Sequence, residues 1–163
     1  MKRIFSTLAA GTTLAMILSL TGCENDSESA GQGSTSTLSG VWKEAGCNMG
    51  FAIDGVNFTE YDNVPDGVKT FSGVIVNSPD LSAQHGLIIV RITDVGTSAP
   101  YGAAVGKFTV ARWVSFTGTT AGQTNARDAD YHPIFYATES EAQALTEASA
   151  ELNRFCCMSS NRI

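Results

Sequence analysis

The chain has 163 residues, which allows one domain with a sizeable hydrophobic core. It carries 10 basic and 16 acidic residues, for a formal net charge of −6 at pH 7. A chain with this acidic balance is not expected to bind nucleic acid, because the phosphates of nucleic acids attract Lys and Arg.

The first 23 residues are organised like a bacterial export signal. Lys2 and Arg3 precede a mainly apolar, uncharged segment over residues 4–20, which is too short and too rich in Ser, Thr and Gly for a membrane span. The segment ends in Leu20-Thr21-Gly22-Cys23, which resembles the lipobox of bacterial lipoproteins. That resemblance implies a signal peptide over residues 1–22 and a diacylglycerol, often joined by a further acyl chain such as palmitate, on Cys23. The alternative is an ordinary secretory signal followed by an incidental Cys.

Residues 24–37, ENDSESAGQGSTST, contain no large apolar side chain, so they cannot bury enough surface to order themselves. We expect residues 23–37 to be the lipidated Cys and a flexible tether, whose 14 polar residues span roughly 20 Å. Residues 38–163 then form a single β-rich domain. The lipobox resemblance places this domain on the exported side of the cell membrane or the outer membrane, held there by lipid.

Several segments predict β-strands, because apolar or β-branched residues alternate with polar ones between turn signals. These segments are 40–45, 49–61, 68–76, 87–95, 106–116, 134–137 and 154–158. Asp54-Gly55 divides the second segment and predicts a tight hairpin. In 106–116, Phe108 and Val110 define the face that we expect to point into the core, which leaves Trp113 on the opposite face.

One helix is expected before the last strand. Thr138 and Glu141 have the spacing of a capping box, and the Ala- and Glu-rich segment 141–153 follows. Its few apolar residues, including Leu145 and Leu152, form a narrow stripe for packing on the domain. The fold class is therefore mainly β: a small antiparallel barrel or sandwich with one late surface helix.

The start of the domain, LSGVWK, resembles the Gly-x-Trp motif of lipocalins in Gly40 and Trp42. In that family the Trp plugs the closed end of a β-barrel. The last third of the chain is similar in layout to small spirochaete lipoproteins with lipocalin-like domains. These resemblances imply a lipocalin-like barrel and carry over no catalytic motif.

Three cysteines remain if Cys23 carries lipid. In an oxidising compartment we expect Cys47 to bridge to Cys156, with Cys157 as the alternative partner, since the two neighbours point to opposite faces of a strand. The third Cys would be a buried thiol or form a mixed disulfide.

The sequence contains no recognised catalytic, phosphate-binding or dinucleotide-binding motif, so we predict no enzymatic activity and no cofactor. Asp128, Asp130 and His132 could converge on a cation, but a solvated loop is the simpler interpretation and no metal site is predicted. Carboxylates at Asp54, Glu60, Asp62 and Asp66 are expected to keep turns soluble.

The predicted role is therefore binding or interaction at the cell envelope. Loops carry function on a rigid β scaffold, and we expect the loops 62–67, 96–102 and 118–132 at one open end. Tyr131 and His132 belong to the last loop, and Trp113 is a further interaction anchor unless another element covers it. The partner would be an envelope protein. The first alternative is a lipocalin-like carrier of a small apolar ligand, and the second is an envelope hydrolase.

Overall fold

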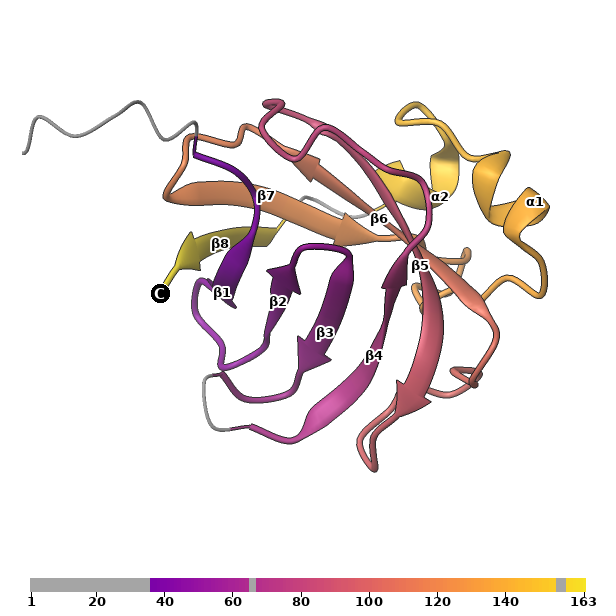
Figure 1. Cartoon of the computed structure of the whole chain (residues 1–163). Coiled ribbons are helices and arrows are strands. Elements are labelled where there is room, and N and C mark those ends of the chain that lie inside the picture. Colours follow the sequence, from indigo (N-terminus) through magenta and orange to yellow (C-terminus); the bar gives the residue numbers. More distant parts are fainter. Residues whose placement is uncertain (1–35, 65–66, 155–157) are drawn as a thin grey trace, which may run out of the picture. The chain divides into compact units, whose positions relative to one another are not determined.

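In the computed structural model, which describes residues 36–64, 67–154 and 158–163, the strands form one closed antiparallel barrel (Figure 1). Each strand pairs with its neighbours in the chain, and β1 closes the barrel against β8, with Trp42 opposite Arg162. The described strands are β1 Gly40–Glu44, β2 Gly50–Asp54, β3 Asn57–Tyr61, β4 Lys69–Ile75, β5 Gly86–Val95, β6 Phe108–Val114, β7 Thr120–Asn125 and β8 Met158–Arg162. The predicted mainly β fold is thus confirmed, as a barrel and not a sandwich.

Two short helices, α1 Glu139–Gln143 and α2 Ala150–Asn153, lie between β7 and β8 in the described part of the chain. None of the helices described there is long and apolar enough to cross a membrane.

The first six strands form close to where the alternation of residues predicted them. The turn between β2 and β3 consists of Gly55 and Val56, one residue later than the Asp54-Gly55 pair, because Asp54 still pairs with Asn57. Gly55 has a φ of +57°, the left-handed conformation that a two-residue hairpin turn requires at its first position.

The prediction of a loop over residues 118–132 is wrong, because Thr120–Asn125 is strand β7. Its sequence, TAGQTN, has two Thr but no large apolar side chain, so it lacks the alternation of apolar and polar residues that predicts a strand. β7 is held by pairing with both β6 and β8. Segment 134–137 makes only an isolated bridge between Phe108 and Tyr136. The last described strand, Met158–Arg162, shares Met158 with the predicted segment 154–158, of which residues 155–157 lie outside the described residues.

The assignment of the two faces of β6 is also wrong. Trp113 is 2% exposed and lies in the barrel core, where its indole N–H donates to the Ala83 carbonyl at 3.0 Å. Phe108 and Val110 belong instead to a second apolar cluster, together with Ala142 and Leu152 from the helical segment. Because β6 is covered on both faces, its alternation alone could not tell the inside from the outside.

Aromatic rings fill much of the barrel interior. Trp42, Phe51, Phe58, Phe71 and Phe135 follow one another with centroid distances between 5.9 and 6.2 Å. Trp42 is fully buried, its indole N–H donates to the Leu38 carbonyl at 2.8 Å, and the Arg162 guanidinium lies 5.1 Å from its ring centroid. The end of the barrel at which β1 begins is therefore filled by side chains.

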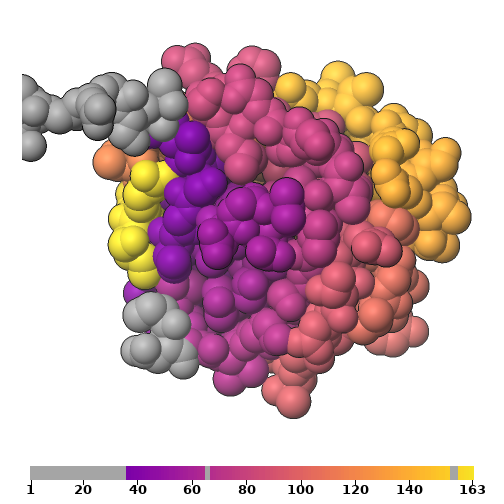
Figure 2. Space-filling view, in the orientation of Figure 1, coloured from indigo at the N-terminus to yellow at the C-terminus, as the bar shows by residue number. Residues whose placement is uncertain are grey.

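The helical segment packs on the outside of β5 and β6. Figure 2 shows it, in gold, at one side of the molecule. The predicted capping box is confirmed: Thr138 Oγ1 accepts from the Glu141 backbone N–H at 3.3 Å, and the Glu141 carboxylate accepts from the Thr138 N–H. The single predicted helix is broken between α1 and α2, where the Thr146 N–H donates to Ser149 Oγ at 2.8 Å. Such side-chain bonds compete with helical hydrogen bonding, and Ser149 becomes the N-cap of α2.

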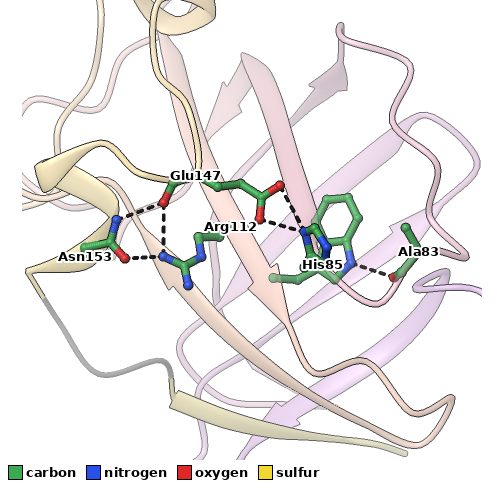
Figure 3. A network of polar contacts seen from close by, with 6 residues as sticks. Ala83, His85, Arg112, Glu147 and Asn153 are labelled. Atoms are coloured by element: carbon green, nitrogen blue, oxygen red, sulfur yellow. Dashed lines mark hydrogen bonds and ion pairs between the residues drawn. The ribbon is translucent and has the colours of Figure 1, made fainter.

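Polar contacts fasten this segment to the barrel (Figure 3). Arg112 Nη1, on the outer face of β6, donates to the Glu147 carbonyl at 3.2 Å and to Asn153 Oδ1. The Glu147 carboxylate lies 2.8 Å from His85 Nδ1, in the loop before β5. The helical segment is therefore tied to the loop before β5 as well as to β6.

Candidate functional site

The two ends of the barrel differ, and the candidate site lies at one of them. Because the strands alternate in direction, the loops that follow β1, β3, β5 and β7 all leave from one end, which we call the mouth. The opposite end, which we call the base, holds Leu38, the Gly55-Val56 turn and the loops before β5 and β7. The predicted loops 62–67 and 96–102 start at the mouth, as do residues 126–132, whereas Gly118 lies at the base.

The interior changes from apolar near the base to polar near the mouth. A space of about 10 Å³ near the base is lined mainly by apolar residues such as Leu38, Phe51 and Trp113. Towards the mouth lies a larger cavity of about 70 Å³, which we call the mouth cavity. Its lining consists of Glu44, Met49, Glu60, Phe71, Pro100, Thr109, Asn125, Arg127, Pro133, Phe135 and Met158.

Glu60 on β3 is the central polar group of the mouth cavity. Asn125 Nδ2, on β7, donates to Glu60 Oε2 at 3.1 Å, and Gln123 Nε2 donates to Asn125 Oδ1 at 3.0 Å. Burial raises the pKa of Glu60 to about 7, although the Asn125 hydrogen bond and the charge of Arg127 oppose the increase. Glu60 therefore changes charge near neutral pH. Glu60 is half-buried and points into the barrel interior, as does Phe58 two residues before it.

Glu44 on β1 is the second carboxylate of the mouth cavity and is 6% exposed. Its Oε2 accepts a hydrogen bond from the thiol of Cys47 at 3.3 Å, and its negative charge contributes to the raised pKa of Glu60. In this structure Cys47 is exposed and has a free thiol. Its predicted partners, Cys156 and Cys157, lie outside the described residues, as does the lipid-anchor residue Cys23.

Two buried acceptor atoms close to this polar layer have no partner among the described residues. Gln123 is 7% exposed, and its Oε1 has no hydrogen bond although its amide nitrogen is bound to Asn125. Ser160, paired with Glu44 across β1 and β8, is fully buried and its Oγ is likewise without a partner. The polar layer thus holds hydrogen-bonding capacity that the described protein atoms leave unused.

A surface groove of about 690 Å³ adjoins the mouth cavity, and Pro133 and Phe135 line both. Its other lining residues include Tyr101, which is fully exposed, Lys107 and the predicted site residue His132. Tyr131, the other predicted residue of this loop, is 54% exposed and has a φ of +67°. Trp113, the third predicted interaction residue, is buried in the barrel and contributes nothing to this surface.

The structure also brings together Asp128, Asp130 and His132, whose ligand atoms lie within 4.8 Å of one another. Asp128 Oδ1 accepts hydrogen bonds from the backbone N–H groups of Asp130 and His132, both at 2.9 Å. These bonds lower the pKa of Asp128 and shape the turn. The turn accounts for the arrangement of the three residues, so we assign no metal to it.

Sequence reasoning missed most of the mouth cavity. The sequence predicts Glu60 as a carboxylate that keeps a turn soluble and places Gln123 and Asn125 in a loop, and no pattern singles out Glu44. Ala121, Gln123 and Asn125 stand at every second position, so in a strand they would share one face. Two of the three are polar, so this spacing gives no apolar pattern from which to predict the strand. Of the other carboxylates considered with Glu60, Asp54 is exposed at the base and Asp66 lies outside the described residues.

No protein-family model matches the chain, and comparisons with curated proteins and with solved structures also found no match.

Proposed function

We propose that the protein is a lipid-anchored lipoprotein of the cell envelope that binds a polar group at the mouth of its barrel, without catalysis. The observation that carries the binding proposal is the mouth cavity, in which two carboxylates occupy a barrel otherwise filled by aromatic side chains. The lipobox resemblance of residues 20–23 supports the lipid anchor.

A carboxyl group inside a barrel has a cost in folding free energy, because burial removes water from it. Apolar side chains at the positions of Glu44 and Glu60 would fill the space without that cost. Titratable groups with a perturbed pKa that line a cavity are typical of binding and catalytic sites. The presence of both carboxylates in this cavity supports a polar ligand at the mouth.

The alternative of an apolar-ligand carrier has no comparable support. A pocket for such a ligand needs about 300 Å³ or more. The interior spaces described above measure about 10 and 70 Å³. The larger one is lined by charged groups, which would lose their hydration against an apolar ligand.

The lipid anchor is tested by expressing the full-length chain and Cys23→Ala in a bacterium. Wild-type protein should partition into detergent and show a mass increase of diacylglycerol size or more, because at least two acyl chains are needed for stable anchoring. Both properties should disappear in the variant. Wild-type protein that stays aqueous and unmodified would refute the anchor.

Binding at the mouth is tested by titrating the isotope-labelled domain with small cationic, anionic, neutral polar and apolar probes and mapping the amide shifts. We expect one class of polar probe to shift signals of β3 and β7 around Glu60 and Asn125. Shifts around Phe51 and Trp113 with a fatty acid would favour the carrier instead. Absence of shifts at the mouth with every polar probe would refute the proposed function.

A further inference from the structure

We propose that the surface groove beside the mouth cavity binds a neutral saccharide, with one sugar ring stacked on Tyr101. This inference goes beyond the proposed function, because it concerns a second site, whose lining includes neither Glu44 nor Glu60. The size of the groove, its exposed aromatic surface and its balanced charges all favour this class of ligand.

Two loops at the mouth form the walls of the groove. Tyr101, Gly102 and Lys107 belong to the loop between β5 and β6, and Asp128 and residues 132–135 belong to the segment after β7. Its volume of about 690 Å³ falls within the range of roughly 300–1,000 Å³ that is typical of ligand sites. The groove is therefore large enough for a small organic ligand, unlike the two spaces inside the barrel.

Backbone hydrogen bonds fix both walls of the groove. In the loop between β5 and β6, the Ala103 N–H donates to the Pro100 carbonyl at 3.1 Å, which closes a turn around Tyr101. In the opposite wall, Tyr136 and Phe108 exchange backbone hydrogen bonds of 2.8 and 3.0 Å. Walls that are already ordered lose little conformational entropy when a ligand binds, so more of the contact free energy appears as affinity.

The aromatic side chains of the groove suit the faces of a sugar ring. Tyr101 is fully exposed, so a ligand can reach the face of its ring. Phe135 is a second lining ring, and its edge-to-face contact with Phe71 at 6.2 Å fixes its orientation. A pyranose ring carries C–H groups on its faces and hydroxyl groups around its rim. The negative face of an aromatic ring attracts such C–H groups, so Tyr101 provides a stacking surface.

The polar side chains of the groove include both donors and acceptors. Lys107 Nζ donates to the Gly102 carbonyl at 3.0 Å, and an ammonium group has two further donors. Hydrogen bonds from the backbone N–H groups of His132 and Asp130 lower the pKa of Asp128, which is therefore an ionised acceptor. The His132 side chain is 76% exposed and available to a ligand. Sugar hydroxyls both donate and accept, so they complement this mixed set.

The charges of the groove favour a neutral ligand over an ion. Among the lining residues, Lys107 is positive and Asp128 is negative, so their charges cancel when His132 is neutral. An anion would be attracted by Lys107 and repelled by Asp128, and a cation would meet the reverse. Neither ion gains a net attraction from the pair, whereas the hydroxyls of a neutral ligand can form hydrogen bonds with both groups.

The fold gives less support to a peptide or to an acyl chain in this groove. An extended peptide often binds by adding a strand to the free edge of a sheet, but the described strands pair on both sides in a closed barrel. An acyl chain would remove water from Lys107 and Asp128 without replacing their hydrogen bonds. A saccharide supplies both the apolar face and the replacement hydrogen bonds.

The experiment titrates the isotope-labelled protein with the neutral trisaccharides cellotriose, maltotriose and chitotriose, which differ in linkage and substituents. Trigalacturonate and a decaproline peptide serve as anionic and peptide controls. We expect at least one neutral trisaccharide to shift the amide signals of residues 101–107 and 128–135, and its own C–H protons to move upfield in the ring current of Tyr101. The affinity should be the same in roughly 0.05 and 0.5 M salt, because salt screens only interactions between charges.

Tyr101→Ala and Tyr101→Phe are the matched variants, and Val56→Ala, at an exposed apolar residue of the base, is the control. Both changes at Tyr101 should leave the fold intact, because the side chain is fully exposed. Tyr101→Ala should weaken trisaccharide binding at least about fivefold, and Tyr101→Phe, which keeps the ring, should stay within about twofold of the wild type. Val56→Ala should bind like the wild type. Lys107→Met, which removes the ammonium donors, should weaken binding at least about threefold.

The outcomes separate this inference from the proposed function. Trisaccharide shifts confined to the groove support the inference, whether or not another probe binds in the mouth cavity. Trisaccharide shifts confined to β3 and β7 around Glu60 and Asn125 would overturn it and would support the proposed function. Tighter binding of trigalacturonate or decaproline than of every neutral trisaccharide, wild-type affinity in Tyr101→Ala, or no shifts with any trisaccharide would also overturn it.

Discussion

Raising the pH from 5 to 8 should destabilise the folded protein, through Glu60. The pKa of this carboxyl is about 7 in the folded barrel, against an ordinary value of 4.5. Between these two values the folded state binds more protons than the unfolded chain, so the free energy of unfolding falls as the pH rises. Below pH 4.5 both states are protonated and the stability contributed by this group is fully present. Above pH 7 it is lost.

The expected loss is about 3 kcal/mol over the whole window, since each pKa difference of one corresponds to about 1.4 kcal/mol. Most of it falls between pH 5 and 8. The acidic groups whose pKa is lowered in the fold, such as Asp94 and Asp128, act in the opposite sense but at lower pH. They stabilise above their ordinary pKa and lose that effect as the pH falls further. Asp94 and Asp128 therefore contribute little to the change in the free energy of unfolding between pH 5 and 8.

Equilibrium unfolding in urea measures this dependence. The two tryptophans of the chain, Trp42 and Trp113, are 0% and 2% exposed, so their fluorescence reports the loss of the barrel core. Wild-type protein and the exposed-site control Asp54→Asn should lose stability from pH 5 to pH 8. Glu60→Gln, which keeps an oxygen for Asn125 and cannot ionise, should show a much smaller slope.

The reasoning would be refuted by wild-type stability that stays level or increases from pH 5 to 8. It would be refuted equally by a slope in Glu60→Gln that equals that of the wild type, since another group would then be responsible.

Three further predictions concern the fold. Phe58→Ala should lower the free energy of unfolding by about 3–5 kcal/mol in urea titrations, because Phe58 is 2% exposed between two stacked rings; a loss below 1 kcal/mol would contradict this packing. Thr138→Ala should cost about 1 kcal/mol by removing the cap of α1, and Thr138→Ser should restore most of it in the same thermal unfolding assay. Deleting residues 120–125 should abolish cooperative unfolding by circular dichroism, because β6 and β8 would lose the strand between them; a deletion that melts like the wild type would show that β7 is dispensable.

Local sequence was sufficient for the parts of this fold that depend on local chemistry. The alternation in 40–116 identified the first six strands, since a strand with one covered face repeats every two residues. The capping box at Thr138 was also predictable, because both of its hydrogen bonds are made within four residues. The same holds for the hairpin at Gly55, whose turn depends on a positive φ that Gly adopts without strain.

Only the tertiary structure decided which face of β6 points into the barrel and where the polar groups gather. Phe108 and Trp113 are both buried, on opposite faces, because the helical segment covers the outside while the barrel encloses the inside. The sequence of β7 has too few apolar side chains to predict a strand. On one side β7 is held by pairing with β8, which is distant from it in the chain. The mouth cavity joins Glu44, Glu60 and Asn125 from three strands. Their proximity, and with it the raised pKa of Glu60, follows from closure of the barrel, because burial depends on what surrounds a residue and not on its neighbours in the chain.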